Sequence, residues 1–149
     1  MKSIYEPATL QEFTKRIDTL TPASQHQWGK MDVSQMLAHC SNALEVTVGD
    51  RSPKSTLMGK LLGRLVKGVI TNPKPFKPNL PTDPSFVIAD SRDFNHEKQR
   101  MINLLSRISK GGPQAMQNRK HPFFGPLTPE EWSTSTYKHM DHHLRQFGA

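Results

Sequence analysis

Helical spacing of apolar residues is the feature that most constrains how this chain folds. In five segments apolar residues recur every three or four positions, and no segment alternates apolar and polar residues long enough to predict a strand. Such spacing puts the apolar side chains on one face of an α-helix. We therefore predict helices over residues 7–20, 33–48, 54–70, 95–110 and 129–147. The expected fold is all-α, a bundle of four helices or of four and a shorter fifth.

Two of the helix starts carry a capping signature. Asp32 precedes the second helix with Gln35 three positions later, and Thr128 precedes the last helix with Glu131 in the same place. In a capping box the first side chain accepts from the backbone N–H three residues on, and the later side chain reaches back. Pro129 suits the first helical position, where a backbone N–H would lack a helical partner.

A proline-rich stretch separates the third and fourth helices. Five prolines fall within residues 73–84, and proline lacks the N–H that a helix interior needs. Residues 71–95 are therefore predicted to form a long extended loop. Loops of this length in a compact protein often cover a cleft or carry function.

Length, charge and cysteine content narrow the class of protein. The 149 residues suit one domain, 1–149, and no apolar run is long enough to span a membrane. The first residues lack the apolar core of a secretory signal, and the one cysteine, Cys40, cannot form a disulfide within the chain. We therefore expect a cytoplasmic protein. The net charge of +7 is scattered, so nucleic acid is not expected as a partner.

The third predicted helix is both amphipathic and basic. Its apolar stripe consists of Leu57, Leu61, Leu65 and Val69, and its basic face of Lys60, Arg64 and Lys67. Such a helix can lie on an anionic membrane or bind nucleic acid, with a steep salt dependence. The ordinary alternative is a helix packed in the bundle or at a dimer contact, and we favour it.

The last helix contains three histidines. At about 100° per residue, His139 and His143 fall on one face, beside the apolar strip of the helix, whereas His142 borders the charged side. We expect Lys138 to face solvent. A histidine pair four residues apart can reach one metal ion, although the same spacing also occurs between surface histidines.

His39, on the second helix, is the candidate for a third ligand. It falls at the edge of the buried arc of that helix, as a ligand projecting into a bundle would. A lone histidine at such a position is more often a core residue with satisfied hydrogen bonds. Three histidines, however, are a ligand set of catalytic metal sites. Cys40 lies deeper in the apolar arc and is interpreted as a small buried hydrophobe.

Five further residues are candidates for a second shell or a pocket around these histidines. Gln35 and Asn42 lie one turn on either side of His39, where they could orient ligands or substrate or be ordinary polar helix residues. Trp132 falls on the same face of the last helix as His139, and His142 is adjacent to His143. His121 opens the segment "HPFFG", either at the mouth of a pocket or in a structural turn.

The segments "MDVSQMLAHCSNALEV", "HPFFGPLTPEEW" and "YKHMDHHLRQFG" resemble the DinB/YfiT-like superfamily of metal-dependent enzymes, closest to a subgroup known only as a domain of unknown function. The resemblance covers most of the chain. It implies a DinB-type four-helix bundle, often dimeric, with a divalent ion held by His39, His139 and His143. Three neutral imidazoles suit Zn, Ni, Fe or Mn. Leu144 and Arg145 stand where relatives have Arg and Gly, and only Gln146 matches there.

The resemblance does not imply one reaction. Some relatives resemble thiol transferases that use low-molecular-weight thiols, and others are linked to isomerisation or hydrolysis. One hypothesis is therefore a metal-dependent enzyme, thiol transferase-like or hydrolase-like, acting on a small-molecule substrate. The other is a non-catalytic bundle that serves as a dimeric binding module. No carboxylate is placed as a general base, since Glu45 falls on the wrong face, so the catalytic residues stay unassigned and a metal-bound water or thiolate is the expected nucleophile.

Overall fold

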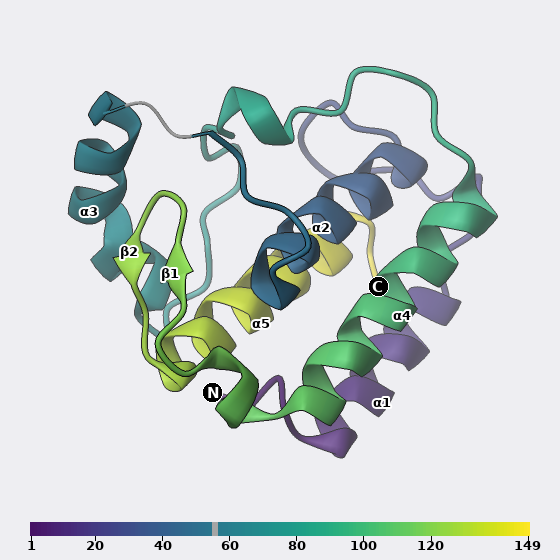
Figure 1. Cartoon of the computed structure of the whole chain (residues 1–149). Helices are drawn as coiled ribbons and strands as arrows, with labels where there is room; N and C mark the ends of the chain where they lie inside the picture. The colour runs from purple at the N-terminus through teal and green to yellow at the C-terminus, as the bar shows by residue number, and fades with distance from the viewer. Residues whose placement is uncertain (55–56) are drawn as a thin grey trace.

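The computed structural model describes residues 1–54 and 57–149, and of residues 57–62 and 64 it describes the backbone alone. The described part contains the helices α1 (Pro7–Asp18), α2 (Val33–Val48), α3 (Leu57–Thr71), α4 (Phe94–Gly111) and α5 (Pro129–Gln146). The prediction of an all-α fold with four or five helices is thus confirmed (Figure 1). Two short 3-10 helices, Pro84–Phe86 and Pro113–Met116, and a hairpin of β1 (Lys120–His121) and β2 (Gly125–Pro126) complete the described elements.

Both predicted capping boxes are present. The carboxylate of Asp32 accepts from the backbone N–H of Gln35 at 2.8 Å, and the Gln35 side chain accepts from the N–H of Asp32 at 3.0 Å. At the start of α5, Thr128 and Glu131 exchange the equivalent bonds at 3.2 and 2.9 Å. These caps fix where α2 and α5 begin, and hence the register of the histidines that both helices carry.

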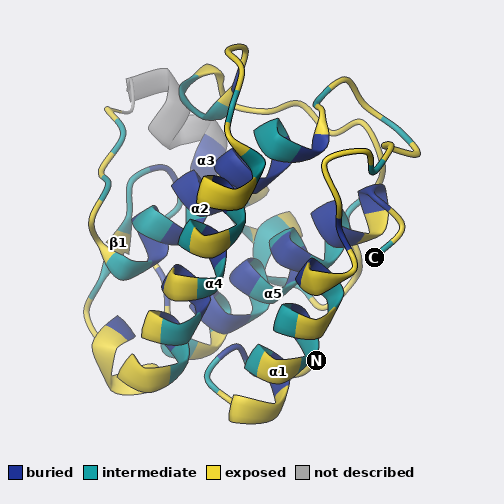
Figure 2. Ribbon diagram, turned by 90° about the vertical axis from the view of Figure 1, so that its right-hand side faces the viewer, coloured by how far each residue is buried: buried dark blue, intermediate teal, exposed yellow. Residues whose placement is uncertain are grey.

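The main core lies between α1, α2, α4 and α5. Helix α2 packs against α4 and α5, and α1 packs against α4 and α5 from outside (Figure 1). The inward faces are buried, as the dark blue stripes of Figure 2 show. Fully buried side chains of this core are Phe13, Ile17, Met36, Leu37, Leu44, Met101, Leu105, Ile108, Met140 and Leu144. Each such side chain stabilises the fold by roughly 1.5–3 kcal/mol, so α2 and α5 are a rigid support.

Helix α3 stands beside this core, next to the β1–β2 hairpin (Figure 1). It contacts α5 and β2, and a methyl group on Gly63 would collide with the carbonyl of Phe123, which allows only glycine there. Of the predicted apolar stripe, Leu65 is 74% and Val69 is 51% exposed. The prediction that these two residues pack within the bundle is therefore wrong. Helix α3 instead turns Val66 and Ile70 toward the interior, where they line a cavity. Leu57 and Leu61 lie outside the described side chains.

The predicted basic face of α3 is represented among the described side chains by Lys67. Its ammonium group donates to the carbonyl of Pro126 at 2.8 Å and pairs with Glu131 at 3.0 Å. Lys67 thus joins α3 to the hairpin and to α5, which argues against a free membrane-binding or nucleic-acid-binding role for this lysine. Lys60 and Arg64 lie outside the described side chains. Within the described part of the chain, no helix is long and apolar enough to cross a membrane.

Lys138 is buried, so the prediction that it faces solvent is wrong. Its side chain donates to the carbonyl of Val69 in the last turn of α3 at 2.6 Å, and lies 4.3 Å from the ring centre of Phe76. Burial lowers the pKa of Lys138 below its usual value. Helical spacing failed here because α3 and the proline-rich segment cover a face of α5 that a bundle of the other helices would leave open.

The proline-rich segment between α3 and α4 is extended apart from the turn at Pro84–Phe86, as predicted (Figure 1). Arg51 donates to the carbonyl of Ser85 at 3.1 Å, and Asp83 accepts from the N–H of Ser85 at 2.9 Å. Farther along, the side chain of Gln35 donates to the carbonyl of Asp90 at 3.3 Å. The bonds of Arg51 and Gln35 attach the segment near the C-terminal and the N-terminal end of α2, respectively.

Candidate metal centre

Three histidines from two helices converge at the junction of α2 and α5. His39 comes from α2, and His139 and His143 lie one turn apart on α5. Each offers one ring nitrogen, and the three nitrogens lie within 4.8 Å of one another. The Nε2 atoms of His39 and His139 are 3.0 Å apart. Residues a hundred positions apart in the sequence therefore form one cluster, and they are the three predicted from the sequence.

A backbone carbonyl orients the ring of His39. Its Nδ1 lies 3.0 Å from the carbonyl oxygen of Phe86. A carbonyl oxygen only accepts hydrogen bonds, so Nδ1 carries the proton and donates it. The Nε2 atom of the neutral ring then has a lone pair directed at the cluster. This pairing of a histidine N–H with a carbonyl is typical of the second shell of metal sites.

A glutamine orients the ring of His143 in the same way. The Nδ1 atom lies 2.8 Å from Oε1 of Gln146, whose Nε2 donates to the carbonyl of Trp28 at 2.7 Å. The second bond fixes which end of the amide faces the histidine, so Nδ1 of His143 donates and its Nε2 has the lone pair. Gly29 has φ of 90°, and a Cβ there would lie 2.5 Å from the Gln146 amide nitrogen. Glycine is therefore required beside this contact.

The histidines of the cluster are neutral near pH 7. Burial, and secondarily the neighbouring imidazoles, hold the pKa of His139 well below its usual value. The same two causes lower the pKa of His143 to about 3, and burial lowers that of His39. His139 keeps some exposed surface because it lines a cavity, but packing on its other sides still removes water. Neutral imidazoles are the protonation state that binds metal.

The donor set fits a divalent transition metal. Two of the three rings are held with the proton on the atom that faces away from the cluster, and the third needs only a change of tautomer to present Nε2. Three neutral imidazoles suit Zn, Ni, Fe or Mn, as predicted. Cys40 is no additional ligand or nucleophile, because it is fully buried against Met36 and burial raises the pKa of its thiol.

A cavity of about 420 Å³ adjoins the cluster. The proline-rich segment covers it, since the side chains of Phe76, Leu80, Pro81 and Phe86 form part of its wall. The loop therefore covers a cleft, which is one of the roles that loops of this length often have. The wall is mostly apolar, and its volume is in the range of small-molecule sites.

Three of the predicted pocket residues line this cavity: His121, Trp132 and His142. His142 stands beside the cluster, with its ring centre 5.0 Å from that of His143 and 5.5 Å from that of Trp28. Trp132 is 3% exposed, and its ring centre lies 5.3 Å from that of His121. His121 also accepts hydrogen bonds from the backbone of the hairpin turn. It therefore has both of the roles considered for it, in the pocket wall and in a structural turn.

Two other predicted residues lie away from the cluster. The side chain of Gln35 is used in the capping box of α2, and that of Asn42 accepts from Arg100 on α4 at 2.9 Å. Neither lines the cavity. Their angles around the helix axis place both residues near His39. In the structure, however, Asn42 faces α4, and the side chain of Gln35 caps the N-terminus of α2. Gln146 and the carbonyl of Phe86 take the orienting role that these two were predicted to have.

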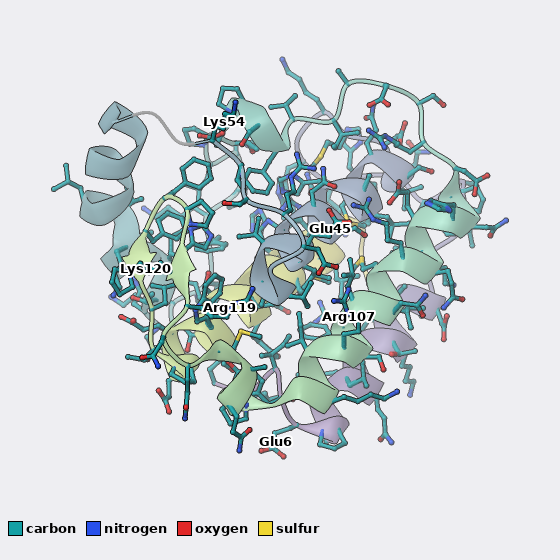
Figure 3. All side chains as sticks on the ribbon, in the orientation of Figure 1. Glu6, Glu45, Lys54, Arg107, Arg119 and Lys120 are labelled. Atoms are coloured by element: carbon teal, nitrogen blue, oxygen red, sulfur yellow. The ribbon has the colours of Figure 1, made fainter. Side chains whose placement is uncertain are left out.

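Two described carboxylates, Glu45 and Asp83, have partners other than the histidines. Glu45 lies between α2 and α4 (Figure 3) and pairs with Arg100 at 2.6 Å, so its predicted position away from His39 is confirmed. Asp83 is the carboxylate among the described cavity-lining residues, and one of its oxygens accepts from the backbone N–H and the hydroxyl of Ser85. Among the described residues, no carboxylate joins the three histidines in the cluster.

Fold and site together define a helical protein with a buried three-histidine cluster at the wall of an apolar cavity. The chain belongs to the family described as Protein of unknown function (DUF1569), which matches residues 5–149. Comparisons with curated proteins and with solved structures gave no significant match. The relation to the DinB/YfiT-like superfamily stays a prediction.

Proposed function

We propose that the protein is a divalent-metal-dependent enzyme in which His39, His139 and His143 hold the ion and a small-molecule substrate binds in the adjoining cavity. The observation that carries this proposal is the approach of three neutral imidazole nitrogens to within 4.8 Å at the wall of a 420 Å³ cavity. A bound divalent ion would supply Lewis-acid activation of a water or a thiol. The resemblance to DinB/YfiT-like enzymes supports the same assignment.

The residues around the cluster have two tasks in this proposal. The carbonyl of Phe86 and the amide of Gln146 hold the rings of His39 and His143 in the tautomer that binds metal. The apolar side chains of the proline-rich segment keep water away from the reacting groups, which strengthens electrostatic interactions there.

Thiol transfer is the reaction that these residues support best. In metal-dependent hydrolases a carboxylate base often assists the metal-activated water, and here Glu45 and Asp83 have other partners. A low-molecular-weight thiol has a pKa near 8.5, so metal activation would ionise it near pH 7 without such a base. Its sulfur would form a bond to an electrophilic carbon of the substrate, its proton would pass to solvent, and the leaving group would depart with the electrons of the broken bond.

Metal content of protein purified without a histidine tag tests the metal site. We expect about one divalent ion per chain in the wild type, and loss of the ion in His39→Ala and His143→Ala. His96→Ala is the matched control, because His96 is an exposed histidine at the start of α4. Equal metal content in all four proteins would contradict the proposed site.

A thiol-consumption assay on the metal-loaded protein tests the reaction. An aromatic electrophile is offered together with cysteine or glutathione, and the loss of free thiol is followed. Consumption that depends on His39 supports thiol transfer, whereas ester cleavage without thiol consumption would assign a hydrolase. Metal binding without either activity would favour the dimeric binding module.

A further inference from the structure

The cavity has a second functional end, remote from the metal cluster along α5. Trp132 and His139 both line it, seven residues apart on one helix, which corresponds to about 10 Å along the axis. His121 lies against Trp132, with ring centres 5.3 Å apart. A molecule in the cavity can therefore touch His121 at one end and reach the histidine cluster at the other.

The hairpin turn sets the tautomer of His121. Its Nδ1 lies 3.2 Å from the backbone N of Phe123 and 3.4 Å from that of Phe124, and both N–H groups donate to it. Nδ1 is therefore an acceptor, and the ring proton is on Nε2. The ring also stacks on Phe124 at 4.2 Å with an angle of 16° between the planes, which fixes its orientation.

The Nε2–H group of His121 has no hydrogen-bond partner among the described residues. Because His121 lines the cavity among aromatic rings, a ligand oxygen that accepts from this donor would gain a hydrogen bond. Burial lowers the pKa of His121 to about 4, and the ring is neutral at pH 7. The neutral ring can donate a hydrogen bond to a ligand oxygen, but it does not attract an anion electrostatically.

The rest of the wall favours an uncharged ligand. Among the described residues that line the cavity there is no lysine or arginine, and Asp83 is engaged with Ser85. The nearby ammonium of Lys138 is directed at the carbonyl of Val69 instead. Much of the remaining wall is aromatic: Phe76, Phe86, Phe123, Phe124 and Trp132. Such a wall binds flat apolar groups, and it offers a carboxylate or phosphate no counter-charge.

We propose that the cavity binds an uncharged aromatic molecule with a carbonyl oxygen, and that His121 is the residue that binds this oxygen through its Nε2–H. That this molecule is a substrate rests on the proposed function, because its other end must reach His39, His139 and His143. The binding preference itself does not depend on the ion and can be measured without it.

A matched pair of probes tests this assignment. 2-Acetonaphthone and 2-ethylnaphthalene have similar size and apolar surface, and only the first has a carbonyl oxygen. Their affinities for the full chain are measured in the presence of a chelator by calorimetry or by tryptophan fluorescence. We expect the ketone to bind about tenfold more tightly, as one buried hydrogen bond predicts. Equal affinities, or no binding of either probe, would overturn the proposal.

Two variants locate the effect. In His121→Phe, which keeps an aromatic ring but has no donor, we expect the two probes to bind equally. His96→Phe is the control, because His96 is exposed at the start of α4 and does not line the cavity. It should keep the tenfold preference. A preference that survives in His121→Phe would assign the carbonyl to another residue and overturn the proposal.

The wild-type protein provides a test that does not depend on the folding of a variant. Long-range ¹H–¹⁵N spectra of the histidine rings report the tautomer, and we expect the proton of His121 on Nε2. The Nε2–H resonance should shift on addition of the ketone and stay in place with ethylnaphthalene. A proton on Nδ1, or equal shifts, would overturn the assignment. Metal content separates the two proposals. A wild-type protein that binds about one metal ion per chain but shows no preference for the ketone would contradict this inference alone.

Discussion

Gln146 shows how much of the site depends on single hydrogen bonds. Its amide oxygen accepts from His143 while its amide nitrogen donates to the carbonyl of Trp28, so one side chain links the cluster to the segment before α2. Without that acceptor, His143 would be free to place its proton on Nε2, the atom that faces the other histidines. The protein therefore controls its candidate ligands through residues that would not touch the ion.

Replacement of Gln146 by leucine tests this control. The change keeps the side-chain size and removes both hydrogen bonds, so we expect affinity for Zn²⁺ to fall by about 10–100-fold, as for other second-shell variants. Competition with a chromogenic chelator measures the affinity. Gln99→Leu, at an exposed position on α4, is the control and should bind as the wild type does. Equal affinity of both variants would mean that Gln146 only supports the fold.

His121 should make stability depend on pH. Its pKa is about 4 in the folded protein and near 6.5 in the unfolded chain, so the unfolded state binds more protons between these values. The stability that the neutral ring contributes is complete above pH 6.5 and is lost as the pH falls toward 4. The difference corresponds to about 3 kcal/mol. Urea unfolding with a chelator present should show a shallower decline for His121→Phe than for the wild type, and parallel declines would contradict this.

At this scale the sequence predicted the ligands better than their supports. His39, His139 and His143 could be found because regular helices fix their angular positions and because the spacing in α5 is a metal-binding pattern. The carbonyl of Phe86 has no sequence signature, since any residue in that turn presents one. Gln146, three positions after His143, did carry a signal in its spacing and could have been proposed as a second-shell residue.

At the scale of the elements, the buried Lys138 of α5 attaches both α3 and the proline-rich segment to the core. The buried ammonium supplies a donor to a carbonyl in the last turn of α3 and packs on Phe76, from the segment that covers the cavity. A cation suits the negative end of the helix dipole, and no carboxylate is needed there. The cover of the cavity is thus attached to α5 at the residue that directly precedes His139.

Lys138→Met removes this anchor while keeping most of the apolar stem. The carbonyl of Val69 loses its donor, and we expect a loss of about 1–3 kcal/mol in the free energy of unfolding. Hydrogen exchange should become faster across residues 68–76, whereas exchange within α2 and α4 stays slow. Lys15→Met on the exposed face of α1 is the control. Unchanged exchange at residues 68–76 would show that other contacts hold the cover.

The helices were predictable because their signals are local. Caps and apolar spacing fix the ends of α2 and α5, and the structure begins and ends these helices within about a residue of the predicted positions. The hairpin of β1 and β2 was missed, since two-residue strands cannot show an alternating pattern. The position of α3 was also beyond reach, because its spacing states which face is apolar but not which part of the protein that face meets.

At the scale of the molecule, the core that holds the histidines and part of the wall of the cavity are formed by different elements. Helices α1, α2, α4 and α5 hold the core and the three histidines, and α3 and the hairpin lie to one side of them (Figure 1). Residues of α3, the hairpin and the proline-rich segment form part of the cavity wall. Apart from the turn at Phe86, whose carbonyl orients His39, the described residues of this part of the wall have no contact with the three histidines that fixes their rings. Substrate entry is therefore expected on the side of α3 and the proline-rich segment.

The outward face of α3 is the surface through which we expect a dimer to form. Leu65 and Val69 are 74% and 51% exposed, and they lie one turn apart on the same face of the helix. Apolar side chains gathered in this way usually mark an interaction surface, and covering one leucine contributes roughly 1.5–3 kcal/mol. A homodimer through α3 would cover this face twice, and it would place both copies of the cavity cover beside the contact.

Leu65→Glu should convert such a dimer into monomers. The new charge would be buried without a partner, so we expect the dissociation constant to rise by at least about 100-fold. Light scattering after size-exclusion chromatography measures the mass of each protein. Val87→Glu is the control, because Val87 is 58% exposed on the proline-rich segment and the change adds the same charge. A monomeric wild type, or a dimer that persists in Leu65→Glu, would remove α3 as the contact and leave its apolar face for another partner.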